Sequence, residues 1–102
     1  MQSIYETFIG RLGKSPELKY TKEGTAVCYL SVAINYENNP TPRWQQVVIW
    51  GKQAEDANLR LKKGSEVFVH GRIQQKVYIN KKTEISKEYQ ELNARVIGFT
   101  SI

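Results

Sequence analysis

The chain has 102 residues, which is the usual length of one compact domain. Its 15 Lys and Arg against 10 Asp and Glu give a net charge of +5, which favours polyanionic partners: nucleic acid first, an anionic membrane surface second. No stretch approaches the ~18 apolar residues that span a membrane, and the N-terminal segment lacks the pattern of a signal peptide. We therefore expect a single domain over residues 1–102, in the reducing cytoplasm and without a membrane.

Cysteine and histidine usage argues against several kinds of site. Cys28 is the only cysteine, so an internal disulfide and a Cys/His zinc site are both excluded, and its apolar surroundings predict a buried, unreactive thiol. His70 is the only histidine and lies within a candidate strand, where a structural role is the commoner one. Because the chain also lacks a nucleophile–base pattern and a phosphate-binding glycine loop, we expect neither an enzyme nor a cofactor or metal.

Turn residues divide the first half of the chain into three candidate strands. Ile4–Leu12 is rich in β-favouring residues, whereas residues 14–25 carry a proline, a glycine and many charges and are interpreted as a loop or ragged hairpin. The second strand is Ala26–Tyr36, and a proline-containing loop over 37–43 separates it from the third strand, Trp44–Trp50. Alternation along the second strand predicts a core face made of Cys28, Leu30, Val32 and Ile34.

The second half of the chain contains one helix and two long strands. The apolar spacing becomes helical over residues 52–63, and Gly64 suits the C′ position just past the helix end. Ser65–Tyr78 and Lys87–Phe99 are strands, with 79–86 as the hairpin loop or its frayed arms. This order predicts an all-β fold, a five-stranded antiparallel OB-type barrel with one helix between its third and fourth strands. The expected inner face of the helix comprises Ala54, Ala57, Asn58 and Leu61.

The segment RWQQVVIWGK (43–52) carries the clearest functional signal. Because side chains alternate along a strand, Val47 and Ile49 face the core while Trp44 and Trp50 share the opposite side, roughly 20 Å apart at ~3.3 Å per residue. Two exposed tryptophans promote aggregation unless a partner covers them, and this spacing suits a platform on which unpaired bases stack. The alternative is that one or both close a barrel end or form a subunit contact.

The strand over residues 65–78 has a similar two-sided pattern. One side is apolar, and the other mixes cations with aromatic rings. A groove that follows a nucleic-acid strand needs both, since cations contact phosphates and rings contact bases; a merely solvated face is the alternative. The apolar side comprises Val67, Val69, Gly71, Ile73 and Val77, and the mixed side comprises Phe68, His70, Arg72, Gln74, Lys76 and Tyr78.

Five stretches together resemble the bacterial single-stranded DNA-binding protein family over almost the whole chain. They are FIGRLGKSPELKY (8–20), TAVCYLSVAIN (25–35), WQQVVIWGKQAE (44–55), LKKGSEVFVHGRI (61–73) and EYQELNARVIG (88–98). The combination is specific, whereas no single stretch would be. The resemblance implies an OB fold that binds single-stranded DNA without sequence preference during replication, recombination and repair, close to the nucleoid.

The resemblance also implies roles for individual residues. The implied base-stacking residues are Trp44, Trp50 and Tyr78, and the implied phosphate contacts are Lys52, Lys63, Arg72 and Lys76, with Arg11 and Lys19 near the strand path. A further stacking position falls near Asn38, where Tyr36 is the nearest substitute. The usual assembly of the family is a homotetramer in which the first strand contributes to a dimer contact, so we expect a tetramer or dimer that covers the apolar Ile4, Phe8 and Ile9.

The chain ends at Ile102 without the acidic, hydrophobic tail by which this family recruits replication and repair proteins. Either the sequence is trimmed to its core, or it is a tailless plasmid, phage, organellar or primosomal relative. In both cases these residues give no basis for predicting that the chain recruits replication and repair proteins. Two other functions stay open on the same fold. One is a primosomal-type replication-restart adaptor, which the missing aromatic near Asn38 favours; the other is a small RNA-binding barrel, because stacking alone does not exclude RNA.

Overall fold

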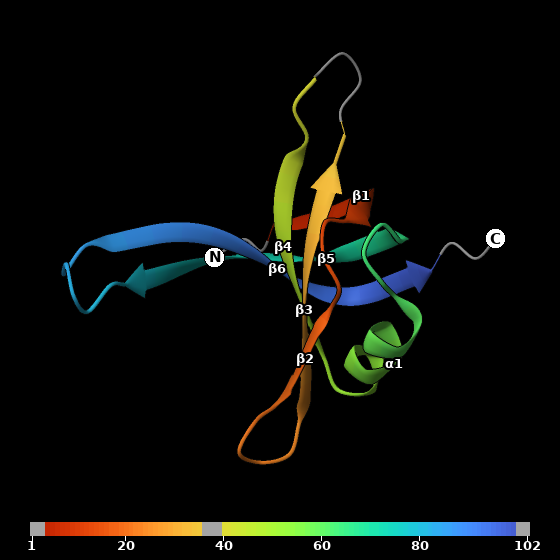
Figure 1. Ribbon diagram of the computed structural model, residues 1–102, viewed down its shortest axis with the longest axis horizontal. Helices are drawn as coiled ribbons and strands as arrows, with labels where there is room; N and C mark the ends of the chain where they lie inside the picture. The colour runs from red at the N-terminus through yellow and green to blue at the C-terminus, as the bar shows by residue number, and fades with distance from the viewer. Residues whose placement is uncertain (1–3, 36–39, 100–102) are drawn as a thin grey trace.

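The computed structural model describes residues 4–35 and 40–99 (Figure 1). It contains six strands and one helix within those ranges. The elements are β1 (Tyr5–Leu12), β2 (Glu17–Tyr20), β3 (Ala26–Ile34), β4 (Arg43–Trp50), α1 (Lys52–Arg60), β5 (Glu66–Ile79) and β6 (Ser86–Phe99).

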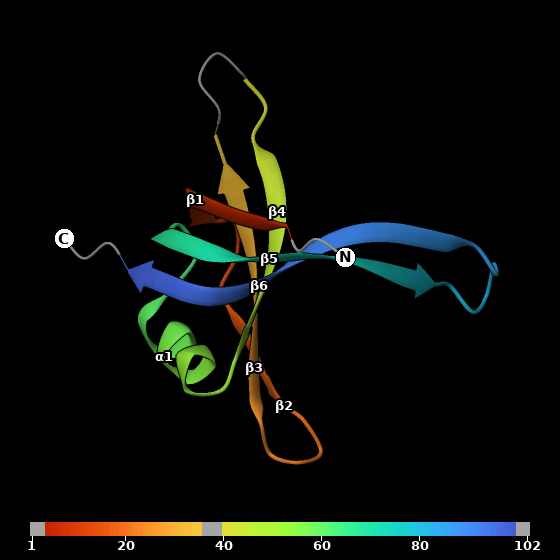
Figure 2. The ribbon, with the colours of Figure 1, turned by 180° about the vertical axis from the view of Figure 1, so that it is seen from behind.

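Five of the strands form a closed ring, which confirms the predicted OB-type barrel. The sheet runs β1-β5-β6-β4-β3, and β3 returns to β1 through the pairs Arg11↔Ala33 and Leu12↔Val32. The helix lies between β4 and β5, which are the third and fourth of the predicted strands. Figures 1 and 2 show α1 beside one end of the ring, with the strands crossing at its centre.

One pairing corrects the expected all-antiparallel barrel. Strands β4 and β6 are parallel, in the register Gln46↔Glu91, Val47↔Leu92 and Val48↔Asn93. They are separated in sequence by α1 and β5, so no tight turn forces them to run in opposite directions. The other pairings of the ring are antiparallel among the described strands.

The core follows the alternation predicted from the sequence. Alternate residues of β3 are buried from Cys28 to Ile34, and Val47 and Ile49 of β4 have no exposed surface. Burial raises the pKa of the Cys28 thiol, in keeping with the unreactive cysteine expected there. Gln45 is the exception on the inner side of β4: it is only 4% exposed, and its side-chain amide donates to the carbonyl of Gln46 at 3.0 Å.

One expected boundary is wrong. The helix ends at Arg60, because Leu61 adopts an extended conformation (φ −101°, ψ 152°), so Gly64 is not its C′ residue. Gly64 instead takes φ +89° in the turn before β5, where its N–H donates to the Leu12 carbonyl at 2.8 Å. Residues 14–25, interpreted as a loop or ragged hairpin, contain the short strand β2 paired antiparallel with β3, so the hairpin is the correct alternative. Of the expected inner face, Ala54 and Ala57 on α1 and Leu61 just after it are buried as predicted, but Asn58 is exposed.

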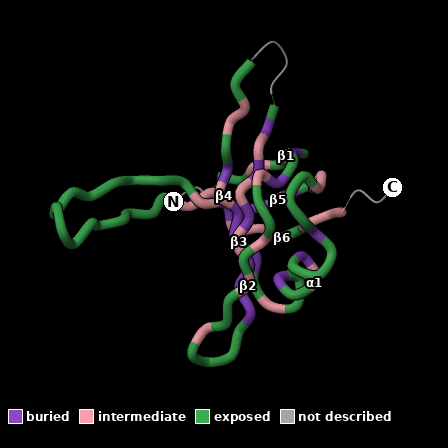
Figure 3. Tube along the Cα trace, in the orientation of Figure 1, coloured by how far each residue is buried: buried purple, intermediate pink, exposed green. Residues whose placement is uncertain are grey.

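The β5–β6 hairpin extends well beyond the ring as an arm (Figure 1). Its described residues from 75 to 90 are all exposed, and Figure 3 shows this arm in the colour of exposed residues along its length. Where the hairpin enters the ring, a Cβ at Gly71 would clash with the backbone of Asn93 and Ala94, so only glycine fits there. Beside it, a bulge inserts Arg95 between the pairs His70↔Val96 and Gly71↔Ala94.

Candidate nucleic-acid interface

Both tryptophans lie on the outer side of β4, as the alternation predicted. Trp44 is 57% exposed and Trp50 is 48% exposed, whereas Val47 and Ile49 on the inner side are fully buried. Gly13 lies against the six-membered ring of Trp44, since a Cβ there would overlap that ring. The Trp50 indole Nε1–H donates to Asn93 Oδ1 at 3.1 Å. The two rings are therefore available to a partner, and each is supported by the barrel on one side.

The pairing register joins these rings to a continuous surface across four strands, which we call the outer face. Because paired residues of neighbouring strands point to the same side, the residues beside Trp44 and Trp50 follow from the register. Its members are Tyr29 and Ser31 on β3, Trp44, Gln46 and Trp50 on β4, Tyr89, Glu91 and Asn93 on β6, and Arg72, Gln74 and Lys76 on β5.

The Trp44 end of the outer face is hollowed into a groove of about 720 Å³, the Trp44 groove. Aromatic rings and polar side chains both line it, and Glu91 is the one acid among the lining residues. The lining includes Tyr29, Ser31, Trp44, Gln46, Tyr89 and Glu91. Arg43 also lines it, but its guanidinium donates to Glu6 Oε2 at 2.6 Å. The groove can thus hold a flat aromatic ligand between rings and offer hydrogen bonds to its edge.

The Trp50 end is cationic, and we call it the Trp50 cluster. A shallow hollow there is lined by Arg72, Gln74, Asn93, Ala94 and Arg95. Asn93 accepts from Trp50 and donates through Nδ2 to Gln74 Oε1 at 2.5 Å, so a chain of hydrogen bonds fixes the indole. The guanidinium of Arg95 lies 5.1 Å from the centre of the Tyr5 ring. Two guanidinium groups beside a held indole suit contacts to phosphates next to a stacked base.

Two further predicted residues continue the outer face onto the β5–β6 arm. Lys76 is exposed and pairs with Tyr89, and Tyr78 is 59% exposed and pairs with Lys87. Tyr78 also lines a hollow of about 290 Å³ near the tip of the arm. The expected alternation of cations and rings along β5 therefore reaches from the ring of strands to the arm.

Lys19 lies close to the outer face but is already paired. Its Nζ is 3.0 Å from Glu17 Oε1 and 5.8 Å from the centre of the Tyr29 ring. The hydrogen bond that Lys19 donates to Glu17 and the charge of that carboxylate raise the pKa of Lys19, so the ammonium stays charged. This pair is exposed, and a phosphate can compete with Glu17 for the lysine.

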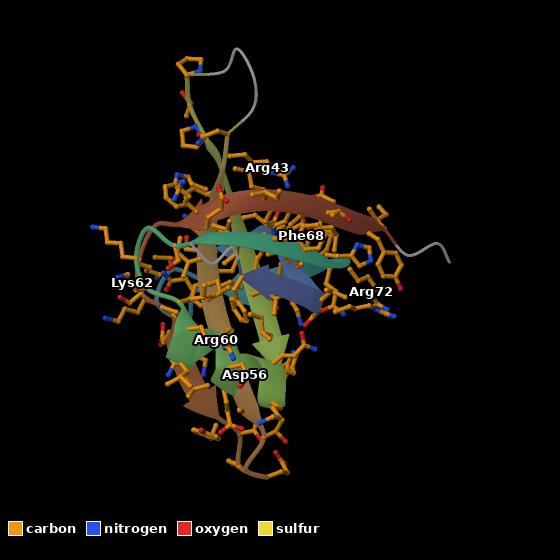
Figure 4. All side chains as sticks on the ribbon, turned by 90° about the vertical axis from the view of Figure 1, so that its right-hand side faces the viewer. Arg43, Asp56, Arg60, Lys62, Phe68 and Arg72 are labelled. Carbon is orange, nitrogen blue, oxygen red and sulfur yellow. The ribbon has the colours of Figure 1, made fainter. Side chains whose placement is uncertain are left out.

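Of the remaining predicted residues, Arg11 is on the same side of the sheet as Trp44, because Arg11 pairs with Ala33 and Ala33 pairs with Trp44. Arg11 donates to the Gly64 carbonyl at 3.1 Å and lies 3.6 Å from Glu66. Lys63 is exposed in the segment between α1 and β5, and Lys52 is the exposed first residue of α1. Tyr36, like Asn38, falls outside the described residues. In Figure 4, the neighbouring Lys62 and the Trp50-cluster residue Arg72 lie on opposite sides of the molecule.

Sequence reasoning missed six residues of the outer face and the Trp50 cluster: Tyr29, Ser31, Tyr89, Glu91, Asn93 and Arg95. Tyr29 was within reach of the sequence, because it alternates with the predicted core residues of β3 and must point outward. Arg95 was not, because the bulge puts both Arg95 and Val96 on the exposed side and breaks the alternation of β6.

The described residues give little support for a catalytic, metal-binding or membrane-spanning site. His70 accepts from or donates to Thr7 Oγ1 at 2.7 Å and stacks on Tyr5 with ring centres 5.8 Å apart, consistent with its expected structural role. Among residues 4–35 and 40–99, no cluster of three His, Cys, Asp or Glu side chains could hold a metal ion. Over the same ranges, α1 is too short to cross a membrane.

Comparison with known proteins agrees with this geometry. The family model described as the single-strand binding protein family matches residues 6–100. The chain belongs to that family. Proteins named single-stranded DNA-binding protein are similar to it: one from Treponema pallidum is 36% identical, over 88% of this chain and 57% of its own length. Those from Neisseria meningitidis and Halalkalibacterium halodurans are 40% and 43% identical, over 72% and 71% of this chain. The chain spans about half the length of these curated relatives.

Proposed function

We propose that this chain binds single-stranded DNA through the outer face, without catalysing a reaction. The observation that carries the proposal is the pair of half-exposed tryptophans on β4, each supported from below and flanked by cations or tyrosines. Stacking on such rings contributes about 1–3 kcal/mol per base and accepts every base, because each has a flat π-face. Binding is therefore expected to tolerate any sequence.

The path of the strand follows from the order of these groups. Bases stack on Trp44 and Trp50, and the strand continues along β5 towards Tyr78. Arg72, Arg95 and Lys76 contact its phosphates, with Lys19 at the other margin of the face. Arg11, Lys52 and Lys63 are further candidates for phosphate contacts, since Arg11 shares a register row with Trp44 and Lys52 follows Trp50 by two residues. Such binding would protect single strands exposed during replication, recombination and repair.

Membership of the family and the relatives' printed names support this proposal, and titration tests it. Tryptophan fluorescence should be quenched strongly as oligo-dT is added, and the affinity should fall as salt is raised. Duplex DNA of the same length should bind far more weakly, because its bases are not free to stack. Absence of quenching at low salt, or equal affinity for duplex, would refute the proposal; a matched oligo-U shows whether RNA competes.

We also propose that the chain self-associates through β1. Ile4 and Ile9 are 64% and 57% exposed, whereas Phe8, the third apolar residue of the expected contact, packs against the core instead. Among the described strands, β1 pairs with β3 only at Arg11 and Leu12, so one edge of residues 5–10 stays open for a second copy. Sedimentation at the titration concentrations should give a dimer or tetramer; a monomer would contradict this.

A further inference from the structure

The Trp44 groove contains an acid that the proposed function does not need. Glu91 lines the groove between aromatic walls, in a chain of net charge +5. Its carboxylate has no hydrogen bond or ion pair with any residue in the described ranges. A carboxylate repels phosphates, so its presence on a surface that binds a polyanion calls for another contact.

The neighbours of Glu91 supply a second free polar group. Gln46 is its partner in the β4–β6 register, and Ser31 is the partner of Gln46 on β3. The side-chain amide of Gln46 likewise has no hydrogen-bond partner within the described part of the chain. Arg43, the cation that lines the same groove, is held by Glu6. An acceptor and an amide therefore lie side by side in a groove that Trp44 and Tyr89 also line.

The chemistry of the four bases decides which of them fits. A carboxylate accepts two hydrogen bonds at once only from adjacent donors, and guanine presents such a pair, N1–H and the N2 amino group, on its Watson–Crick edge. Cytosine and adenine place an acceptor beside their amino group, and thymine places an acceptor on each side of its single N–H. Guanine also has O6 next to N1–H, where an amide N–H can donate.

We propose that the Trp44 groove is a guanine subsite within an otherwise sequence-tolerant interface. Glu91 accepts from N1–H and N2–H of the base, Gln46 donates to O6, and the ring stacks against the aromatic wall. A groove of about 720 Å³ has room for a purine. This inference rests on the proposed function, because it specifies which base one part of that same surface favours.

The test compares guanine with inosine, which differs only by lacking the N2 amino group. Repeats of dT-dT-dG and dT-dT-dI of equal length are titrated in lithium salts, which disfavour guanine quadruplexes. The guanine repeat should bind about tenfold more tightly, the order expected when one hydrogen bond to a charged group is lost. Equal affinity of the two repeats would overturn the inference while leaving the proposed function intact, and absence of binding to either would overturn both.

A pair of variants assigns the preference to Glu91. Glu91→Gln should bring the two affinities close together, because the amide offers one acceptor in place of two. The matched control is Glu88→Gln, which removes the same charge from the same strand but on the opposite side of β6. Both variants should bind DNA more tightly overall, and only the control should keep the guanine preference. A preference that survives in Glu91→Gln, or is lost in both variants, would contradict the assignment.

Discussion

The two tryptophans of β4 occupy similar positions on one strand, but their surroundings differ. Trp50 is held by Asn93 and lies among the cations Arg72 and Arg95. Trp44 rests on Gly13, and its indole N–H has no partner among the residues that the structure describes. It lies beside a groove whose free polar groups include an acid. The Trp50 cluster thus offers positive charge and a fixed ring, and the Trp44 groove offers a recess with hydrogen-bonding groups.

This difference teaches that a face which tolerates any sequence need not be uniform. A stacked base next to guanidinium groups is held by its ring and its phosphate, and neither depends on base identity. A stacked base in a recess exposes its edge to side chains, and there identity can matter. We therefore expect the Trp50 cluster to contribute affinity and salt dependence, and the Trp44 groove to contribute whatever base preference exists.

The largest expected effects come from removing each ring. Trp44→Ala and Trp50→Ala should each weaken binding of oligo-dT by about 1–3 kcal/mol, since each removes one stacking platform. Fluorescence anisotropy of a labelled oligonucleotide measures the affinity of each variant without relying on the emission of the remaining tryptophan. Only Trp44→Ala should also reduce the guanine-to-inosine ratio. An equal reduction of that ratio in Trp50→Ala would contradict the assignment of the base preference to the Trp44 groove.

An intermediate effect is expected from the cations of the Trp50 cluster. Arg72→Gln and Arg95→Gln should each lower the slope of log affinity against log salt by about 0.7, the value for one phosphate contact on a single strand. Arg60→Gln is the matched control, because Arg60 is an exposed arginine on α1 that lies 5.6 Å from the Phe99 ring and away from Arg72 (Figure 4). A slope that changes as much in Arg60→Gln would indicate a diffuse charge effect.

The smallest effect is expected from the hydrogen bond that holds Trp50. Asn93→Ala should free the indole and weaken oligo-dT binding by about 0.5–1.5 kcal/mol, the usual net value of one hydrogen bond. In a Trp44→Phe background, the remaining emission should shift to the red and its anisotropy should fall. Asn93→Asp keeps an acceptor for the indole, so its emission should stay near the parent value. An unchanged spectrum in Asn93→Ala would show that packing alone positions Trp50.

Much of the site could be predicted because it depends on alternation within single strands. The positions of Trp44 and Trp50 opposite Val47 and Ile49 require only that β4 be a strand with one buried side. The same argument places Arg72, Lys76 and Tyr78 together on β5. Tyr29 could have been found in this way too. By contrast, the grouping of Lys52, Lys63 and Arg11 with these residues came from charge and resemblance, and it stays a prediction.

The sequence by itself determined the strands, the single helix, the buried cysteine and the two exposed tryptophans, because local polarity and turn residues decide these features. Only the tertiary structure decided which strands became neighbours. The parallel β4–β6 pairing brings Glu91 beside Gln46 and Asn93 within reach of Trp50, and the bulge at Arg95 turns a cation outward. Register between distant strands is set by closing the barrel around its core, which no single segment encodes.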